Sequence, residues 1–230
     1  MKHLKTLDSS TAGTRACILL FVLVVYLFLP VVAASSESTD TFEFLSEDYA
    51  DAMLNIEDKS ELKQRLGYLL EKATVLRDTS GSPESIYLLA RITYGSSTNQ
   101  SVFGVRRAMR VSKELIEQAL KIDEELLSGT PKALLGYLYV GLPGWPMSFG
   151  DKDKGLELLK EAMAIDDQNM SNNYFFAGGL IREGNYEAAR DQLIRARELA
   201  DSNSSMVNMQ ALILREINSD LRNIEERLSH

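Results

Sequence analysis

Apolar residues recur at intervals of three and four along almost the whole chain after residue 42, with polar residues between them. This spacing is that of one face of an α-helix, and no segment alternates with period two for long enough to predict a strand. The pattern therefore predicts an all-α protein. The expected helices lie near residues 43–56, 58–78, 83–95, 103–128, 131–141, 151–165, 170–182, 185–200 and 205–228.

Capping residues support several of these boundaries. Ser82-Pro83 and Thr130-Pro131 each place a capping side chain before a proline at the first helical position. Proline fits there because the first N–H groups of a helix have no partner within the helix. Asp58 and Glu61 have the spacing of a capping box, which predicts a helix start at that point.

The last predicted helix has one apolar stripe and one polar face. The stripe consists of Met206, Met209, Ile213, Ile217, Leu221, Ile224 and Leu228. Such a helix can cover the end of a stack of helices, and the alternative is a coiled-coil dimer. We favour the capping helix, because stacked repeats need a terminal element with a polar outer face.

The chain repeats itself at an offset of 34 residues. At this offset FGDKDKGLELLKEAMAIDDQN aligns with EGNYEAARDQLIRARELADSN, so that Gly150 matches Gly184 and Leu159 matches Leu193. Each segment has a turn glycine followed by small, large and small residues on one helix face, which favours close packing against another helix. A fixed period of this length predicts a stack of helical hairpins.

These positions resemble the tetratricopeptide repeat, a family of helix–turn–helix units. The last repeat matches best, with Gly184-Asn185-Tyr186 as the turn and small or large apolar residues at the family's positions: Ala177, Leu180, Ala189, Leu193 and Ala196. The preceding repeat opens with Leu135-Gly136 and Tyr139, and a weaker copy covers residues 83–122. The resemblance implies an α-solenoid of tetratricopeptide-like hairpins with a C-terminal capping helix.

One of these repeats carries an insertion in its turn. Nineteen residues separate Gly136 from Gly155, whereas 12 separate the equivalent Ala177 and Ala189. The inserted segment, VGLPGWPMSFGD, contains the only tryptophan, Trp145, and two of the five prolines. Two interpretations remain open: the loop offers its aromatic surface to a ligand or partner, or Trp145 folds back to fill a gap between helices.

Residues 1–34 have the features of an export signal. Three basic residues precede an uncharged run, ACILLFVLVVYLFL, and Val32-Ala33-Ala34 supplies small residues before a cleavage point. This pattern predicts a signal peptide removed after Ala34. The alternative is a retained anchor, since the 19 residues from Ala16 to Ala34 are near the minimum for a bilayer span. Residues 35–230 then form one helical domain, exported to the periplasm or cell envelope.

The charge balance bears on possible partners. The chain has 25 basic and 33 acidic residues. Without residues 1–34, which hold three basic residues and one acid, the balance is 22 against 32, a net charge of −10. An acidic chain lacks the basic face that neutralises phosphates, so nucleic-acid binding is not expected.

The residue inventory also argues against catalysis. Histidine occurs only at His3 and His230, and the only cysteine, Cys17, lies within the predicted signal. A histidine triad, a His-ligated zinc and thiol chemistry are therefore not expected. Adjacent acids such as Glu124-Glu125 point apart on a helix, whereas acid–base chemistry needs two carboxyls facing across a cleft. We predict that the protein is not an enzyme and uses no metal and no cofactor.

The helix start Phe149-Gly150-Asp151 after the insertion is similar to that in one branch of the family, the T-component of periplasmic tripartite (TRAP-type) transporters. This resemblance implies an accessory protein of a solute transport system that binds an apolar small molecule or a substrate-binding partner. The residues expected to make contacts are Tyr137, Tyr139, Trp145, Phe149 and Tyr174. The alternative is an envelope scaffold that assembles proteins without a small ligand. A homo-oligomer remains open, and membrane contact is expected only through an uncleaved N-terminal segment.

Overall fold

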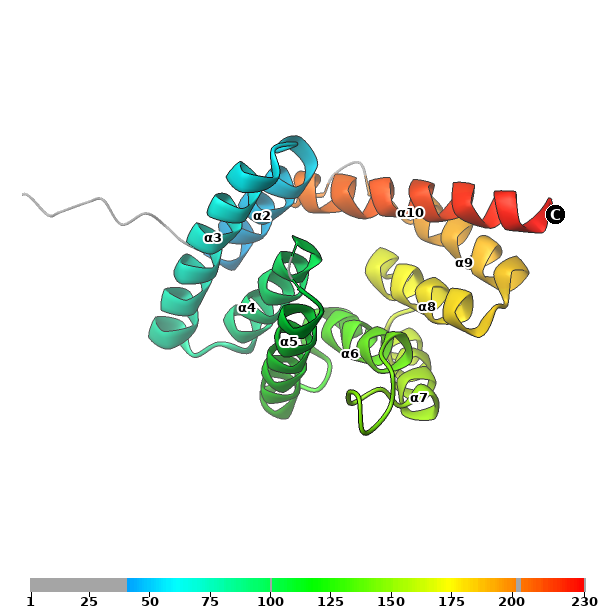
Figure 1. Cartoon of the computed structure of the whole chain (residues 1–230), viewed down its shortest axis with the longest axis horizontal. Helices are drawn as coiled ribbons and strands as arrows, with labels where there is room; N and C mark the ends of the chain where they lie inside the picture. The colour runs from blue at the N-terminus through cyan, green and yellow to red at the C-terminus, as the bar shows by residue number, and fades with distance from the viewer. Residues whose placement is uncertain (1–40, 100, 202–203, 230) are drawn as a thin grey trace, which may run out of the picture. The chain divides into compact units, whose positions relative to one another are not determined.

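A computed structural model of the chain describes residues 41–99, 101–201 and 204–229. Within this part of the chain every regular element is helical (Figure 1), which confirms the prediction of an all-α protein. The predicted export signal, residues 1–34, lies outside the described residues. No helix in the described ranges combines the length and the apolar composition needed to cross a bilayer.

Nine α-helices and two short 3₁₀-helices follow one another along the described chain. The α-helices are α2 (Phe42–Asn55), α3 (Lys59–Ser80), α4 (Pro83–Gly95), α5 (Val102–Ile122), α6 (Thr130–Gly141), α7 (Lys152–Ile165), α8 (Met170–Glu183), α9 (Tyr186–Glu198) and α10 (Val207–Leu228). The 3₁₀-helices are η1 (Ser96–Asn99) and η2 (Leu126–Gly129). The predicted boundaries differ from these by two residues or fewer, except at the end of α5.

Side-chain caps fix several of the helix starts. The Asp58 carboxylate accepts hydrogen bonds from the N–H groups of Ser60 (2.9 Å) and Glu61 (2.8 Å) at the start of α3. The Ser82 hydroxyl accepts one from the Ser85 N–H (3.3 Å) at the start of α4, where Pro83 follows the cap. Each such cap stabilises its helix by about 1 kcal/mol.

Helix α5 ends at Ile122 instead of continuing to residue 128, as its apolar pattern predicts. The Asp123 carboxylate accepts a hydrogen bond from the Glu125 N–H (3.0 Å), a local turn that competes with the helix. Leu127, Ser128 and Gly129 then adopt left-handed conformations, with φ of 49°, 52° and 85°. Gly129 is therefore the residue that precedes α6. Thr130, which was predicted to cap this helix, is instead its first helical residue and makes no capping bond.

Each α-helix packs against the next, and the most extensive contacts join α4 to α5, α6 to α7 and α8 to α9. The two segments related by the 34-residue offset contain α7 and α9, which are the second helices of two consecutive pairs, α6/α7 and α8/α9. Two glycines set the spacing of the first pair. A Cβ on Gly136 would lie 2.7 Å from the Gly155 carbonyl oxygen, and one on Gly155 would lie 2.8 Å from the Gly136 carbonyl oxygen. A larger side chain at either position would force α6 and α7 apart.

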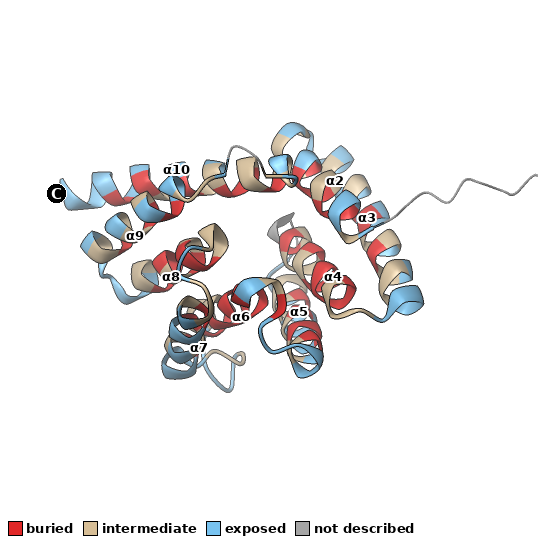
Figure 2. Cartoon of the chain, turned by 180° about the vertical axis from the view of Figure 1, so that it is seen from behind, coloured by how far each residue is buried: buried red, intermediate tan, exposed pale blue. Residues whose placement is uncertain are grey.

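The apolar stripe of α10 is buried along its middle, whereas Met206 at one end is half-buried and Leu228 at the other is exposed. The stripe residues Met209, Ile213, Ile217, Leu221 and Ile224 are all buried, and α10 contacts α8, α9 and α2. Buried residues in general lie on the helix faces that are turned toward neighbouring helices (Figure 2). The first and last described helices therefore touch, and the succession of helices closes on itself (Figure 1).

Polar contacts tie α2 to α10. The residue before α10, Met206, makes no side-chain cap. The Glu47 carboxylate of α2 takes its place, accepting hydrogen bonds from the N–H groups of Asn208 (2.8 Å) and Met209 (3.0 Å). Arg215 of α10 donates through Nη1 to the Met53 carbonyl oxygen (2.7 Å). A side chain from one end of the chain thus completes a helix at the other end.

Candidate functional site

A cavity of about 210 Å³ lies among alternate helices of the chain, and we call it the inner cavity. Helices α2, α4, α6, α8 and α10 all contribute to its wall. The lining residues are Tyr49, Met53, Arg91, Tyr94, Gly95, Leu134, Tyr174, Phe175, Leu212, Ile213 and Glu216. The wall is therefore mostly apolar and aromatic, with one basic and one acidic side chain, which is typical of small-molecule sites.

Gly95 allows the phenol of Tyr49 to lie against α4. A Cβ at position 95 would lie 2.0 Å from the Tyr49 hydroxyl oxygen, so no other residue fits at this position without displacing that ring. Burial raises the pKa of the Tyr49, Tyr94 and Tyr174 hydroxyls above their ordinary value. These phenols therefore stay protonated at physiological pH and can donate hydrogen bonds.

Arg91 is the one cation among the described residues that line the inner cavity. Its Nη1 donates a long hydrogen bond to the Tyr87 hydroxyl (3.5 Å). Burial lowers the pKa of the guanidinium, the neighbouring Tyr87 and Tyr49 raise it, and the net direction is upward, so the group stays charged. No carboxylate within the described ranges forms an ion pair with it.

Arg91 also lines a second cavity, of about 310 Å³, which we call the outer cavity. Its wall consists of Phe42, Ser46, Tyr87, Arg91, Leu127, Ser128, Thr130, Asn169, Ser171, Met206 and Met209. This described lining contains no acidic residue. Within the described part of the chain, Leu127 and Ser128 are the two non-glycine residues with left-handed backbone, and Asn172 donates from Nδ2 to the Ser128 carbonyl oxygen (2.8 Å). Strained backbone of this kind is held in place by its surroundings and clusters at functional sites.

Two of the five residues predicted to make contacts lie at or beside the inner cavity. Tyr174 lines it, and its ring centroid is 5.4 Å from that of Phe175. Tyr137 also packs against Phe175, with the centroids 5.8 Å apart. A Cβ on Gly178 would lie 2.7 Å from the Tyr137 ring, so this glycine lets α6 and α8 approach around the aromatic cluster.

Tyr139 and Phe149 form a different cluster, between α5 and α7. Their rings meet edge to face with centroids 5.5 Å apart. The Tyr139 hydroxyl donates to Glu117 (3.3 Å) and accepts from Lys154 Nζ (3.0 Å), and Lys113 lies 5.7 Å from the Phe149 ring centroid. These contacts attach the inserted loop to the helices, so the two residues have a packing role here.

Trp145, the remaining predicted contact residue, lies in the inserted loop, which projects from the helices between α6 and α7 (Figure 1). Its side chain is 90% exposed, and that of Met147 is 61% exposed. Trp145 therefore does not fill a gap between helices, the second of the two interpretations left open by the sequence. The five predicted residues occupy three separate places.

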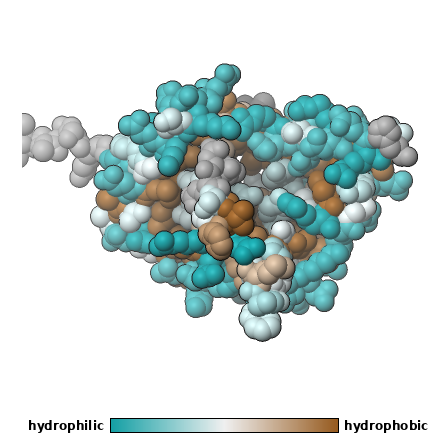
Figure 3. Space-filling model, viewed as in Figure 1, coloured by the Kyte–Doolittle hydropathy of each residue, from teal (hydrophilic) through white to brown (hydrophobic). Residues whose placement is uncertain are grey.

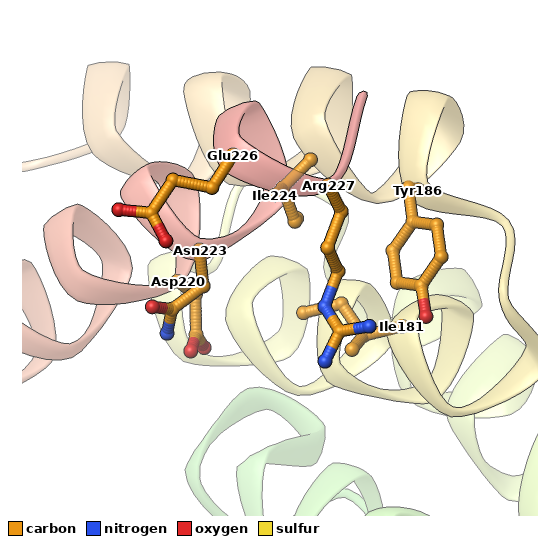
Figure 4. A pocket seen from close by; sticks show the side chains of 7 residues that line it. All are labelled: Ile181, Tyr186, Asp220, Asn223, Ile224, Glu226 and Arg227. Carbon is orange, nitrogen blue, oxygen red and sulfur yellow. The ribbon is translucent and has the colours of Figure 1, made fainter. Parts of the chain in front are cut away.

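A hollow of about 580 Å³ lies near the end of α10, where this helix passes α8 and α9 (Figure 4). Its lining residues are Ile181, Tyr186, Asp220, Asn223, Ile224, Glu226 and Arg227. The Arg227 guanidinium lies 5.4 Å from the Tyr186 ring centroid. Asn223, Glu226 and Arg227 are exposed, so water competes for their polar groups. The inner cavity is smaller but removes a ligand from water more completely.

The molecular surface on the face shown in Figure 3 is mostly hydrophilic, with apolar residues in separate patches. Among the described residues, no group of three or more His, Cys, Asp or Glu side chains is arranged to hold a metal ion. Comparison with protein-family profiles and with curated proteins gives no match.

The principal wall residues that the sequence analysis missed are Tyr49, Arg91, Tyr94, Phe175 and Glu216. A signal for part of this set exists in the segment SIYLLARITY. Tyr87, Arg91 and Tyr94 stand at positions i, i+4 and i+7, which share one helix face. An arginine within an otherwise apolar helix face marks either an ion pair or a binding site.

Proposed function

We propose that this chain is an exported tetratricopeptide-like binding protein that holds a small, largely apolar molecule in the inner cavity. In this proposal the helical pairs form an α-solenoid that α10 closes, and the protein acts by binding, without covalent chemistry. Its place would be the periplasm or cell envelope, as an accessory component of a solute transport system. The export signal and the resemblance of the repeats support this location and role.

One observation carries the binding proposal: side chains from five helices that are not neighbours in sequence enclose a cavity with aromatic and aliphatic walls. A closed arrangement fixes such a wall more firmly than a loop does, because each helix is held by its neighbours. An apolar cavity of about 150 Å³ takes up benzene in water. The inner cavity, at about 210 Å³, has room for a ligand somewhat larger than one ring.

The test is calorimetric titration with indole, a neutral aromatic probe of suitable size. Met53→Trp places a bulky ring in the cavity wall and should abolish indole binding. Met147→Trp makes the same change in the exposed loop and should leave the affinity unchanged. Both variants need melting temperatures close to that of the parent chain. Indole binding by Met53→Trp with parental affinity would remove the inner cavity from the proposal.

Trp145 supports a second candidate, docking of a protein partner on the inserted loop. An exposed tryptophan beside an exposed methionine is the kind of anchor that dominates protein interfaces. Trp145→Ala should leave the free energy of unfolding within about 0.5 kcal/mol of the parent and weaken capture of envelope proteins. The scaffold alternative, assembly of envelope proteins without a small ligand, also requires docking of a protein partner and is tested by the same variant. It fails if the variant captures the same proteins as the parent chain.

A further inference from the structure

Arg91 carries a charge that the described residues leave without a counter-ion. The guanidinium lines both cavities, and the residue is half-buried. Its hydrogen bond within the described chain is the 3.5 Å contact with the Tyr87 hydroxyl. A buried charge without a counter-ion destabilises a fold unless something else compensates for it. Natural proteins retain such groups mainly at functional sites.

The acidic residue of the inner cavity does not neutralise Arg91. The Glu216 carboxylate accepts from Nη2 (3.0 Å) and Nε (3.3 Å) of Arg215, the next residue toward the N-terminus of α10. Arg215 also donates to the Met53 carbonyl oxygen (2.7 Å). Glu216 therefore already forms an ion pair with Arg215, at the end of the cavity where α10 meets α2. Arg91 has no counter-ion among the described residues.

We propose that the inner cavity binds a small organic monocarboxylate, with the carboxylate on Arg91 and an aromatic or short aliphatic body against Tyr94, Tyr174 and Phe175. This inference rests on the proposed function and specifies its ligand. A guanidinium pairs with a carboxylate through two parallel hydrogen bonds. The neutral phenols of Tyr49 and Tyr94 supply further donors beside it.

Charge and volume select this class. One guanidinium balances one negative charge, whereas a dianionic phosphate ester would leave a buried excess charge near Glu216. A cavity of about 210 Å³ is larger than the roughly 150 Å³ that suffices for benzene. One ring and a short acid side chain, as in phenylacetate, fill that space.

The experiment compares phenylacetate with its neutral isostere phenylacetamide on the full chain, by calorimetric titration at pH 7. Phenylacetate should bind about 10- to 100-fold more tightly, the usual effect of one charge-assisted bidentate contact. Arg91→Gln should remove this preference. Arg110→Gln, at an exposed position of α5, is the matched control and should preserve it. Without ligand, both variants need melting temperatures close to that of the parent chain.

The possible outcomes separate this inference from the proposed function. Equal affinities for the acid and the amide would overturn the carboxylate inference and leave a neutral binding cavity intact. Failure of both probes would also overturn it, and the indole titration then decides the proposed function by itself. A preference that persists in Arg91→Gln would assign the carboxylate to another group. If Arg91→Gln does not fold, Arg91→Lys keeps the charge without the bidentate geometry and should reduce the preference.

Discussion

Removing the Glu47 carboxylate tests how the first and last helices are joined. This carboxylate accepts the N–H groups of Asn208 and Met209, at 2.8 and 3.0 Å, where α10 has no cap of its own. Loss of a helix cap costs about 0.5–2 kcal/mol, and loss of a negative charge at a helix N-terminus costs about 0.3–1 kcal/mol. Glu47 is partly exposed, so the lower half of each range applies.

Glu47→Ala should therefore lower the free energy of unfolding by about 1.5 kcal/mol, and Glu47→Gln, which keeps one acceptor oxygen, by about half as much. In a domain of 150–250 residues the alanine variant should melt about 3–6 °C lower. The assays are thermal unfolding and amide hydrogen exchange, with faster exchange expected at Asn208 and Met209. Glu43→Ala, at an exposed position one turn earlier in α2, is the control.

Unchanged exchange at these two amides in Glu47→Ala would refute the capping role, even if the melting temperature fell. A loss confined to α2 would show that Glu47 stabilises its own helix alone. Equal effects of Glu43→Ala and Glu47→Ala would mean that a general loss of negative charge on α2 causes the change.

Two further predictions follow from close contacts and from burial. Gly136→Ala places a Cβ 2.7 Å from a backbone oxygen of α7 and should destabilise the chain by about 2 kcal/mol. Gly67→Ala, where a Cβ would have no atom within 4 Å, should instead stabilise it by about 0.5–1 kcal/mol. Urea unfolding measures both changes, and the opposite ranking of the two variants would contradict the packing of α6 on α7. Burial, and then the neighbouring Glu216, raise the pKa of the Asp220 carboxyl. The folded state therefore binds this proton more tightly than the unfolded state. As a result, the contribution of Asp220 to the free energy of unfolding falls as the pH rises from the ordinary carboxyl pKa to the raised pKa, and it stays constant at higher pH. Asp220→Asn should flatten that part of the melting-temperature profile, which begins near the ordinary carboxyl pKa of about 4 and extends above it, and a profile parallel to that of the parent chain would refute the effect.

Most of the helices could be predicted from sequence because a helix buries one stripe and the stripe has a period. The end of α5 was the exception. There the apolar pattern continues through Leu126 and Leu127, but the Asp123 side chain bonds to the Glu125 N–H and three left-handed residues follow. Periodicity records which residues are buried, and Leu126 is buried although the backbone around it is no longer α-helical.

Contact between α2 and α10 could not be predicted in the same way. Glu47 is one charged residue among many on a helix surface, and its partners lie 161 and 162 positions further along the chain. An N-terminus without a capping side chain, such as that before Val207, shows that α10 needs an acceptor from elsewhere. It does not show which residue supplies the acceptor.

The structure places the predicted contact residues at separate sites, and for two of them the reason can be read from their spacing in the sequence. Tyr137 and Tyr139 are two positions apart on one helix, so their side chains point to nearly opposite faces. They could not have shared one site, and the structure places one beside Phe175 and the other against Phe149. The same rule applied to α4 groups Tyr87, Arg91 and Tyr94, of which Arg91 and Tyr94 line the inner cavity and Tyr87 lines the outer one. The aromatic content of the sequence indicated the inserted loop, whereas the spacing of residues on one face of α4 indicates the residues that line the cavities.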